Sequence, residues 1–418
     1  MKICFIADVR SPTSRNWISH FVDSGHDVTV IATYPCLPDM VKGAKVIEVP
    51  IAFSRLARSR HNGTIKGTNR KSLIDLSMDR VRTGSAFAFL IAAWTWLSPI
   101  EIHRHVRSIR RLITDLSPDL VHAMRIPFEG IVGSIATPSR TPLVVSVWGN
   151  DFTWIAQQNP LIARQTRRTV QRTDALVCDN FRDLRLAAEA WHFDSGKLGT
   201  VLPGAGGVQA TVFHPGPPPP ELSRQLTIPY GGLVVMNPRG FRGYVHNEIF
   251  FQAIPLVLQQ VADVVFLCCA MEDNSSAERW VRRLNIAHAV RLLPMVPREQ
   301  MANLFRLAHV SVSPSIHDGT PNSLIEAMAC GCFPVAGDIE SVREWITDGE
   351  NGLLCDPTNP ESVAQAILRA LKDRGLRDKA REINLQLVNE RADYDKVMAE
   401  AEKFYHRVIQ RAHSSVQV

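Results

Sequence analysis

Two carboxylates, Asp318 and Glu326, stand eight residues apart across a Gly-Thr-Pro turn that opens into a predicted helix. Such a turn leaves backbone N–H groups free at the positive end of the helix dipole, which suits a diphosphate. Glu326 is about two helical turns from Asp318, so we expect both on the same side of that helix. Glu326 can accept hydrogen bonds from a ribose diol, and Asp318 can reach a sugar hydroxyl. These residue types indicate a site for a nucleotide-activated sugar.

A longer motif surrounds the two carboxylates. Asp318, seven further residues, Glu326 and then the run Ala-Met-Ala-Cys-Gly at 327–331 resemble the signature of retaining glycosyltransferases of family 4, or group 1. The first carboxylate of that signature is Glu, so Asp318 is one methylene shorter, which predicts a shifted or water-mediated sugar contact. The likeness continues at residues 334–336, 340–344 and 348–357.

The resemblance implies a fold and a reaction. The fold is the α/β type called GT-B, with two Rossmann-like domains facing across a cleft and a C-terminal helix crossing back to the first domain. The reaction transfers a hexose-type sugar from a nucleotide-diphosphate sugar to a hydroxyl acceptor with retention of anomeric configuration. It implies no metal and no cofactor besides the donor.

Donor-binding residues follow from the same resemblance. Arg239 follows a predicted strand where the family places an arginine that contacts the donor diphosphate, and a guanidinium suits that task. The family adds a lysine five residues later, where this chain has Tyr244. Either Arg242 stands in for it, or backbone amides meet the leaving-group charge. The expected donor-binding residues are Glu326, Arg239, Arg242, Gly319, Thr320, Pro321 and Asn322.

Two residues of the first domain join Asp318 as candidate catalytic residues. His122 ends a predicted strand where the family carries a histidine, so it contacts the donor sugar or acceptor, accepts a proton, or is a packed core histidine. Asp151 follows another strand and either orients the acceptor or only forms a turn. Glu129 either binds a hydroxyl or caps a helix.

Strand-like and helix-like segments alternate, which predicts parallel sheets covered by helices. Predicted strands of the first sheet cover residues 2–7, 27–32, 120–122, 143–147, 175–178 and 197–202. Those of the second cover residues 232–236, 264–268, 290–293 and 310–312.

The domain boundaries follow from this pattern and from a proline cluster at 215–220. We expect a first, acceptor-side domain at 1–212, a stiff linker at 213–228 and a nucleotide-sugar domain at 229–393. By resemblance, a returning helix covers 394–418. Gly206 and Gly207 stand where the family has its hinge, and they allow close approach of a nucleotide.

Positive charge is concentrated in one segment. The chain carries a net charge of +6, and residues 55–111 hold 12 basic against 3 acidic side chains around an apolar, Trp-bearing stretch at 86–97. This segment is either a peripheral contact with an anionic membrane or a buried helix beside a solvated basic face. No nucleic-acid motif accompanies the charge.

Composition gives further expectations. The eight cysteines lack a CxxC pair, which predicts reduced thiols and a cytoplasmic protein. No leader and no spanning segment is predicted.

Other classes remain open besides the transferase. The chain could be another GT-B enzyme, such as an epimerase or a phosphorylase. It could also be a catalytically weak or silent sugar-nucleotide-binding protein, since Asp318, Tyr244 and Met124 all depart from the family pattern. The donor sugar, its base, the acceptor (glycan, lipid-linked or small molecule) and the oligomeric state are open.

Overall fold

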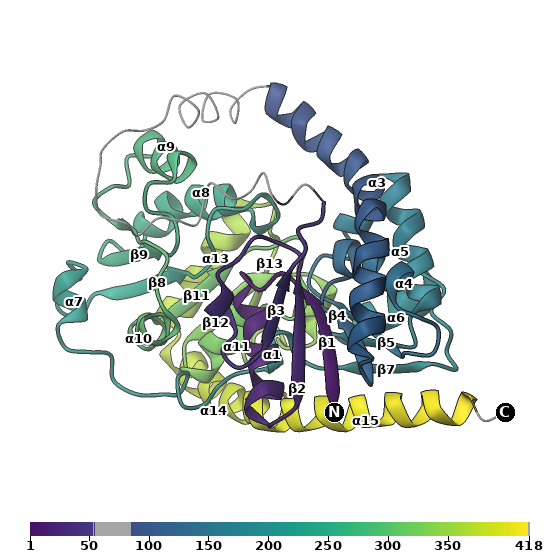
Figure 1. Ribbon diagram of the computed structural model, residues 1–418. Coiled ribbons are helices and arrows are strands. Elements are labelled where there is room, and N and C mark those ends of the chain that lie inside the picture. Colours follow the sequence, from purple (N-terminus) through teal and green to yellow (C-terminus); the bar gives the residue numbers. More distant parts are fainter. Residues whose placement is uncertain (53, 55–84, 417–418) are drawn as a thin grey trace. The chain divides into compact units, whose positions relative to one another are not determined.

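The computed structural model describes residues 1–52, 54 and 85–416 (Figure 1). The chain forms two compact units. The first contains Met1–Cys178, Asp183–Val201 and Ala401–Val418, and the second contains Asp179–Arg182 and Leu202–Glu400. The domain boundaries drawn from the sequence, with their linker at 213–228, remain predictions.

A seven-stranded parallel sheet forms the centre of the first unit, in the order β3-β2-β1-β4-β5-β6-β7. The order reverses between β1 and β4, so the loops after these strands diverge and leave room for a ligand at their carboxyl ends. The strands are β1 (Lys2–Ala7), β2 (Asp27–Ala32), β3 (Lys45–Glu48), β4 (Leu120–Ala123), β5 (Leu143–Val147), β6 (Ala175–Cys178) and β7 (Leu198–Val201).

Helices cover both faces of this sheet. They are α1 (Pro12–Asp23), α3 (Ser85–Leu116), α4 (Ile131–Ala136), α5 (Pro160–Arg172) and most of α6 (Phe181–Glu189). On one face, Ile109 of α3 and Val170 of α5 are buried against the strands. On the other, Phe21 of α1 stacks on Tyr405 of α15 (Tyr394–Val416), with ring centroids 4.7 Å apart. The end of the C-terminal helix is thus part of the first unit, as the resemblance predicted.

A six-stranded parallel sheet forms the second unit, in the order β10-β9-β8-β11-β12-β13 (Figure 1). Its strands are β8 (Leu233–Asn237), β9 (Val264–Cys268), β10 (Val290–Leu292), β11 (Val310–Ser313), β12 (Phe333–Gly337) and β13 (Leu353–Cys355). Its helices are α7 (Leu222–Gln225), α8 (Asn247–Leu258), α9 (Ser275–Arg283), α10 (Arg298–Leu307), α11 (Asn322–Ala329), α12 (Glu340–Arg343), α13 (Pro360–Lys372), α14 (Arg374–Arg391) and the first turns of α15.

Helices cover both faces of the second sheet. Successive side chains of each strand point to opposite sides, so neighbouring residues of one strand are buried in different cores. Val235 of β8 belongs to the core under α8 and α13. Its neighbours Val234 and Met236 belong to the core under α10, α11 and α14. Phe213, just before the proline cluster, is buried in that second core as well. The parallel α/β architecture predicted from the sequence is confirmed in both units.

The basic segment at 55–111 falls largely outside the described residues. Residues 55–84 are not described, and of residues 85–100 only the helical backbone is. In the described part of α3, Ile109 is buried, whereas Arg104, Arg107 and Arg110 are exposed. These arginines form a solvated face, and the membrane contact remains a prediction. Within the described residues, no helix combines the length and apolar character needed to cross a bilayer.

Candidate active site

The Gly-Thr-Pro turn joins β11 to α11 in the second unit, at the carboxyl end of the sheet. Pro321 is the N-cap residue and α11 starts at Asn322, with no side-chain hydrogen bond to the cap. Asp318 therefore lies in the loop before the helix, and Glu326 lies only about one turn into it. This corrects the expectation that both carboxylates share one helix face two turns apart. The predicted opening of the turn into a helix is confirmed.

Hydrogen bonds from neighbouring segments hold this loop in shape. Ser341 Oγ donates to the carbonyl oxygen of Asp318 at 2.7 Å, and Trp345 Nε1 donates to Thr320 Oγ1 at 3.0 Å. The backbone amide of Thr320 donates to Asp179 Oδ2 at 3.3 Å. A side chain at Gly319 would collide with the same carboxylate, because its Cβ would lie 2.3 Å from Asp179 Oδ2. The loop thus already presents an amide to an anionic group.

Arg239 and Asp318 form an ion pair at the end of β8. Arg239 Nη1 lies 2.6 Å from Asp318 Oδ2, and the two side chains are only 13% and 10% exposed. Burial lowers the pKa of Arg239, but Asp318 and Tyr244 more than offset this effect, so the pKa lies above its ordinary value. The structure therefore brings together Arg239, which was predicted to bind phosphate, and Asp318, which was predicted to bind the sugar. The ion pair holds each side chain in place.

Tyr244 connects this ion pair to a second arginine. Arg239 Nη2 donates to the Tyr244 hydroxyl at 3.4 Å, and Arg242 Nη1 donates to the same oxygen at 3.0 Å. The Arg239 guanidinium also lies 5.8 Å from the centre of the Tyr244 ring. In the sequence Tyr244 was only a departure from the family pattern. Its contacts make it a member of the site.

Glu326 pairs elsewhere, with Arg298 of α10. Arg298 Nη2 lies 3.7 Å from Glu326 Oε1, and Arg298 Nη1 donates to Gln209 at 2.8 Å. Burial raises the pKa of Glu326 from 4.5 to about 7, against the opposing effect of Arg298. Arg298 could not be identified from the sequence, since only the fold brings α10 and α11 together.

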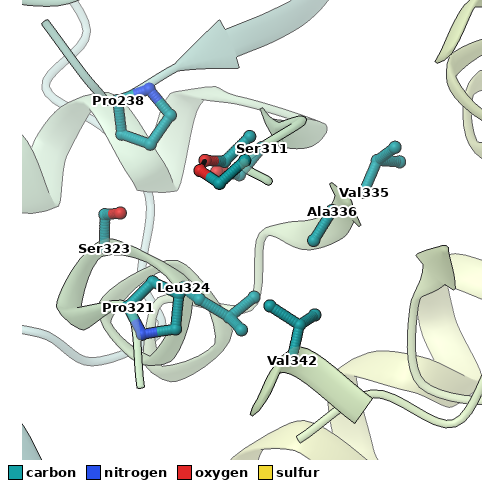
Figure 2. Close-up of a pocket in the computed structure, with 10 residues that line it drawn as sticks. Pro238, Ser311, Pro321, Ser323, Leu324, Val335, Ala336 and Val342 are labelled. Carbon is teal, nitrogen blue, oxygen red and sulfur yellow. Dashed lines mark hydrogen bonds between the residues drawn. The ribbon is translucent and has the colours of Figure 1, made fainter. Parts of the chain in front are cut away.

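A small cavity lies beside the same loop (Figure 2). Its volume is about 10 Å³, room for one water molecule at most, so a nucleotide sugar would have to bind outside it. Figure 2 shows Pro238, from the end of β8, across this cavity from Pro321 and Ser323 at the start of α11. Serine residues of β11 and its following loop contribute to a lining that is mostly apolar. The cavity is lined by Pro238, Ser311, Ser313, Ser315, Pro321, Ser323, Leu324, Val335, Ala336 and Val342.

His122 lies in the core of the first unit, on β4. It is fully buried, its Nε2 lies 2.8 Å from Ser146 Oγ, and its Nδ1 is hydrogen-bonded to the Tyr405 hydroxyl. Burial lowers the pKa of His122 to about 3, so the ring is neutral near pH 7. These contacts favour the packed histidine among the alternatives left open by the sequence. A contact with substrate remains a prediction.

Asp151 is also fully buried, and it holds Arg125. Asp151 Oδ1 lies 2.9 Å from Arg125 Nε, and Oδ2 accepts from the backbone amide of Trp148 at 3.0 Å. The Arg125 side chain is 44% exposed, so the cation, rather than Asp151, faces outward. The role of Asp151 toward an acceptor remains a prediction, and Arg125 was missed.

Glu129 lies near this pair in the same unit. Its Oε1 accepts a hydrogen bond from Thr33 Oγ1 at 2.8 Å, and burial raises its pKa to about 7. Asp8 adds to this rise and Arg125 opposes it. Glu129 lies within a π-helical turn, Ile126–Gly130, so the simple helix cap considered from the sequence is not what holds it.

Gly206 and Gly207 lie close to the point where the chain enters the second unit. Both have positive φ, +78° and +89°. A Cβ at Gly206 would lie 2.4 Å from Met398 Sδ, and one at Gly207 would lie 2.3 Å from the carbonyl oxygen of Ala392. Close packing against Ala392 at the end of α14 and Met398 of α15 therefore requires glycine here, and hinge motion remains a prediction. No group of three or more His, Cys, Asp or Glu side chains among the described residues is placed to hold a metal ion.

Family models match both parts of the chain. A model described as "Glycosyl transferases group 1" matches residues 221–386, and one described as "Glycosyl transferase 4-like domain" matches residues 11–204. Together they cover most of the sequence. The chain belongs to the group 1, or family 4, glycosyltransferases.

Curated relatives are more distant and match in part. The chain is 25% identical over 221 residues to a D-inositol 3-phosphate glycosyltransferase of Corynebacterium urealyticum, covering 50% of each chain. It is 33% identical over 108 residues to the O-antigen chain mannosyltransferase B of Escherichia coli, covering 26% of each. The chain thus matches about half the length of the first of these relatives, and less of the second.

Solved structures share the fold along nearly the whole chain. Sucrose-phosphate synthase from Thermosynechococcus elongatus aligns with a TM-score of 0.74 at 15% identity, covering 98% of this chain and 100% of that one. Anabaena HepE in complex with UDP-glucose aligns with a TM-score of 0.68 at 15% identity, covering 99% and 100%. At such low identity these likenesses show the fold alone, and it is the GT-B fold.

Proposed function

We propose that this protein is a retaining glycosyltransferase that moves a hexose-type sugar from a nucleotide-diphosphate sugar to a hydroxyl acceptor. The observation that carries the proposal is the Arg239–Asp318 ion pair beside the start of α11. It places a cation and a carboxylate beside a helix N-terminus, where a diphosphate and its sugar can be bound together. Family membership supports it.

In this proposal the donor diphosphate binds Arg239 and the backbone N–H groups at the start of α11, and Asp318 turns to a sugar hydroxyl. Each charge-assisted hydrogen bond is worth on the order of 1.5–3 kcal/mol. Because a glycosyl diphosphate is already activated, the protein has to orient the two substrates and stabilise the leaving phosphate. Glu326, held near Arg298, binds the ribose diol.

UDP is the first nucleotide to test, since relatives of the same fold were solved with UDP or UDP-glucose. ADP and GDP follow. The acceptor is a hydroxyl compound, and the names of the curated relatives make D-inositol 3-phosphate and O-antigen glycans the first acceptors for a panel.

A thermal-shift screen with UDP, GDP, ADP and their common sugars tests the proposal, in the wild type and in Glu326→Ala. A ligand that binds the folded state raises the melting temperature by mass action. We expect a shift with one nucleotide family that is lost or strongly reduced in Glu326→Ala. No shift with any nucleotide sugar at millimolar concentration would contradict the proposal.

The same ligands then distinguish turnover from binding. We expect release of the nucleoside diphosphate when the correct acceptor is added. Donor binding without release across the acceptor panel would replace the transferase by a silent sugar-nucleotide-binding protein.

We also propose a cytoplasmic location, because all eight cysteines of the chain are free thiols and all but Cys36 are buried. A peripheral membrane contact through residues 55–111 is kept as a proposal. Binding to vesicles containing anionic lipid, lost when the arginines of that segment are replaced, would test it.

A further inference from the structure

One hydroxyl in the second unit accepts hydrogen bonds from two guanidinium groups. Arg239 and Arg242 both donate to the Tyr244 hydroxyl, at 3.4 and 3.0 Å. Each guanidinium carries a full positive charge, and both approach the same neutral oxygen. Two like charges so close repel each other unless an anion lies nearby. Asp318 supplies one negative charge, on the Arg239 side.

The backbone around Tyr244 is fixed on both sides. The amide of Ile316, in the loop that leads to Asp318, donates to the carbonyl oxygen of Tyr244 at 3.0 Å. The amide of Arg242 donates to the side chain of Asn247 at 3.0 Å, and Asn247 is fully buried. The backbone that carries Tyr244 is therefore held in place, and the side chain of the exposed Arg242 is hydrogen-bonded to the Tyr244 hydroxyl.

We propose that Tyr244 is a positioning residue that holds Arg239 and Arg242 together as a two-arginine clamp for the donor's diphosphate. The inference rests on the proposed function, since it assigns the residues that bind the leaving group of that reaction.

Three features of the site support this assignment. Arg239, Arg242 and Asp318 together carry a net charge of +1, which favours binding of an anion by the two arginines. Two planar guanidinium groups can each bind phosphate oxygens in a bidentate manner, and a diphosphate offers oxygens on two phosphorus atoms. A flexible arginine loses side-chain entropy when it binds, and tying Arg242 to Tyr244 beforehand reduces that cost.

The test is a double-mutant cycle measured by calorimetry with the nucleoside diphosphate that binds the wild type. Tyr244→Phe removes only the hydroxyl, and Arg242→Ala removes the second cation. We expect each change to weaken binding about 5- to 20-fold, and the double variant to be scarcely weaker than Arg242→Ala alone. Tyr230→Phe is the matched control, since Tyr230 is a fully exposed tyrosine of the same unit.

Two further readouts separate positioning from general damage. The corresponding nucleoside monophosphate, which lacks the second phosphate, should show a smaller effect of Tyr244→Phe. Tyr244→Lys, which supplies its own cation, should retain affinity for the diphosphate, and Arg242→Ala should then have little effect in that background.

The possible failures are distinguishable. If Tyr244→Phe binds the nucleoside diphosphate as tightly as the wild type, the clamp is wrong while the proposed function stands. The same holds if the losses of affinity from Tyr244→Phe and Arg242→Ala multiply in the double variant. If the wild type binds no nucleoside diphosphate, the proposed function itself fails and the clamp with it.

Discussion

Asp318 forms the shortest ion pair of the site, with Arg239. Replacing Asp318 distinguishes its proposed role in sugar binding from the binding of the phosphates. In Asp318→Asn the charge that holds Arg239 is lost, as is the charge-assisted contact proposed for the sugar hydroxyl. We expect kcat/KM for the nucleotide sugar to fall roughly 10- to 100-fold, which corresponds to about 1.5–3 kcal/mol. Affinity for the free nucleoside diphosphate should stay equal or rise, because a negative charge near the phosphates is removed.

Steady-state kinetics and calorimetry on the same preparations check this pair of outcomes. Asp318→Glu is the control, since it introduces the carboxylate that the family carries and should retain turnover. A parallel loss of nucleoside diphosphate affinity in Asp318→Asn would assign Asp318 to holding Arg239 alone.

Glu326 makes stability depend on pH. Its pKa rises from 4.5 to about 7 on folding because the carboxyl group is buried. The folded state therefore favours the protonated form of Glu326. The contribution of this group to folding stability is fully present below pH 4.5 and is lost as the pH rises through 7. The shift corresponds to a loss on the order of 3 kcal/mol across that window.

Glu326→Gln removes the titrating group while keeping its shape. We expect the wild type to lose more unfolding free energy than this variant between pH 5 and pH 8, measured by denaturant titration. Since Glu129 shifts in the same direction, Glu129→Gln serves as a second comparison. Identical pH profiles for the wild type and Glu326→Gln would refute the assignment.

At the scale of elements, a buried tyrosine hydroxyl links the C-terminal part of α15 to the rest of the first unit by hydrogen bonds. The Tyr405 hydroxyl accepts from Trp17 Nε1 at 2.9 Å and is hydrogen-bonded to His122 Nδ1. Tyr405→Phe keeps the ring that stacks on Phe21 but leaves these nitrogens without that partner. A buried polar group without a partner costs about 1–3 kcal/mol, so we expect a loss of that size.

Thermal unfolding and hydrogen exchange along α15 measure this loss. Tyr230→Phe, at an exposed position, should be neutral. An unchanged melting temperature together with unchanged exchange protection of α15 would show that the hydroxyl does not anchor the helix.

Elements with a strong apolar pattern could be predicted from the sequence. β1 at Lys2–Ala7 and β9 at Val264–Cys268 match their predicted bounds, because a strand buried on both faces is a continuous apolar run. The short strands β3 and β13 were missed, and so was β12, whose Pro334 argues against a strand. β3 lies at the sheet edge, where its charged Lys45 and Glu48 are exposed.

The site could be predicted in part. The loop, the helix and the residues Arg239, Asp318 and Glu326 were identified from their motif. The partner Arg298 was not, because its pairing with Glu326 joins two helices and leaves no local pattern in the sequence. Tyr244 lies close to Arg239 and Arg242 in the sequence, but nothing in the residue types showed that its hydroxyl would accept from both. The burial of Asp151 was not predicted either, and that of His122 was one of several alternatives, because burial depends on packing by distant segments such as α15.

At the scale of the whole molecule, the chain passes between its units beside Gly206 and Gly207. Gly207→Ala would place a Cβ 2.3 Å from the Ala392 carbonyl oxygen, at a φ of +89°. We expect a loss of stability on the order of 2 kcal/mol or more, since neither the backbone nor the contact can accept the methyl group.

The melting temperature checks this loss, with Gly216→Ala as control. The nearest atom to a Cβ at Gly216 lies at 3.8 Å, so that methyl group fits and stability should hardly change. Equal melting temperatures for the two variants would mean that the chain near Ala392 can move aside.

The structure of the protein with its bound nucleoside diphosphate tests the central claim most directly. We predict phosphate oxygens at about 3 Å from the Arg239 guanidinium and from the backbone amides at the start of α11. Asp318 would then have turned from Arg239 toward the sugar position. A diphosphate bound elsewhere, with the Arg239–Asp318 ion pair intact and the α11 amides without phosphate, would contradict the account.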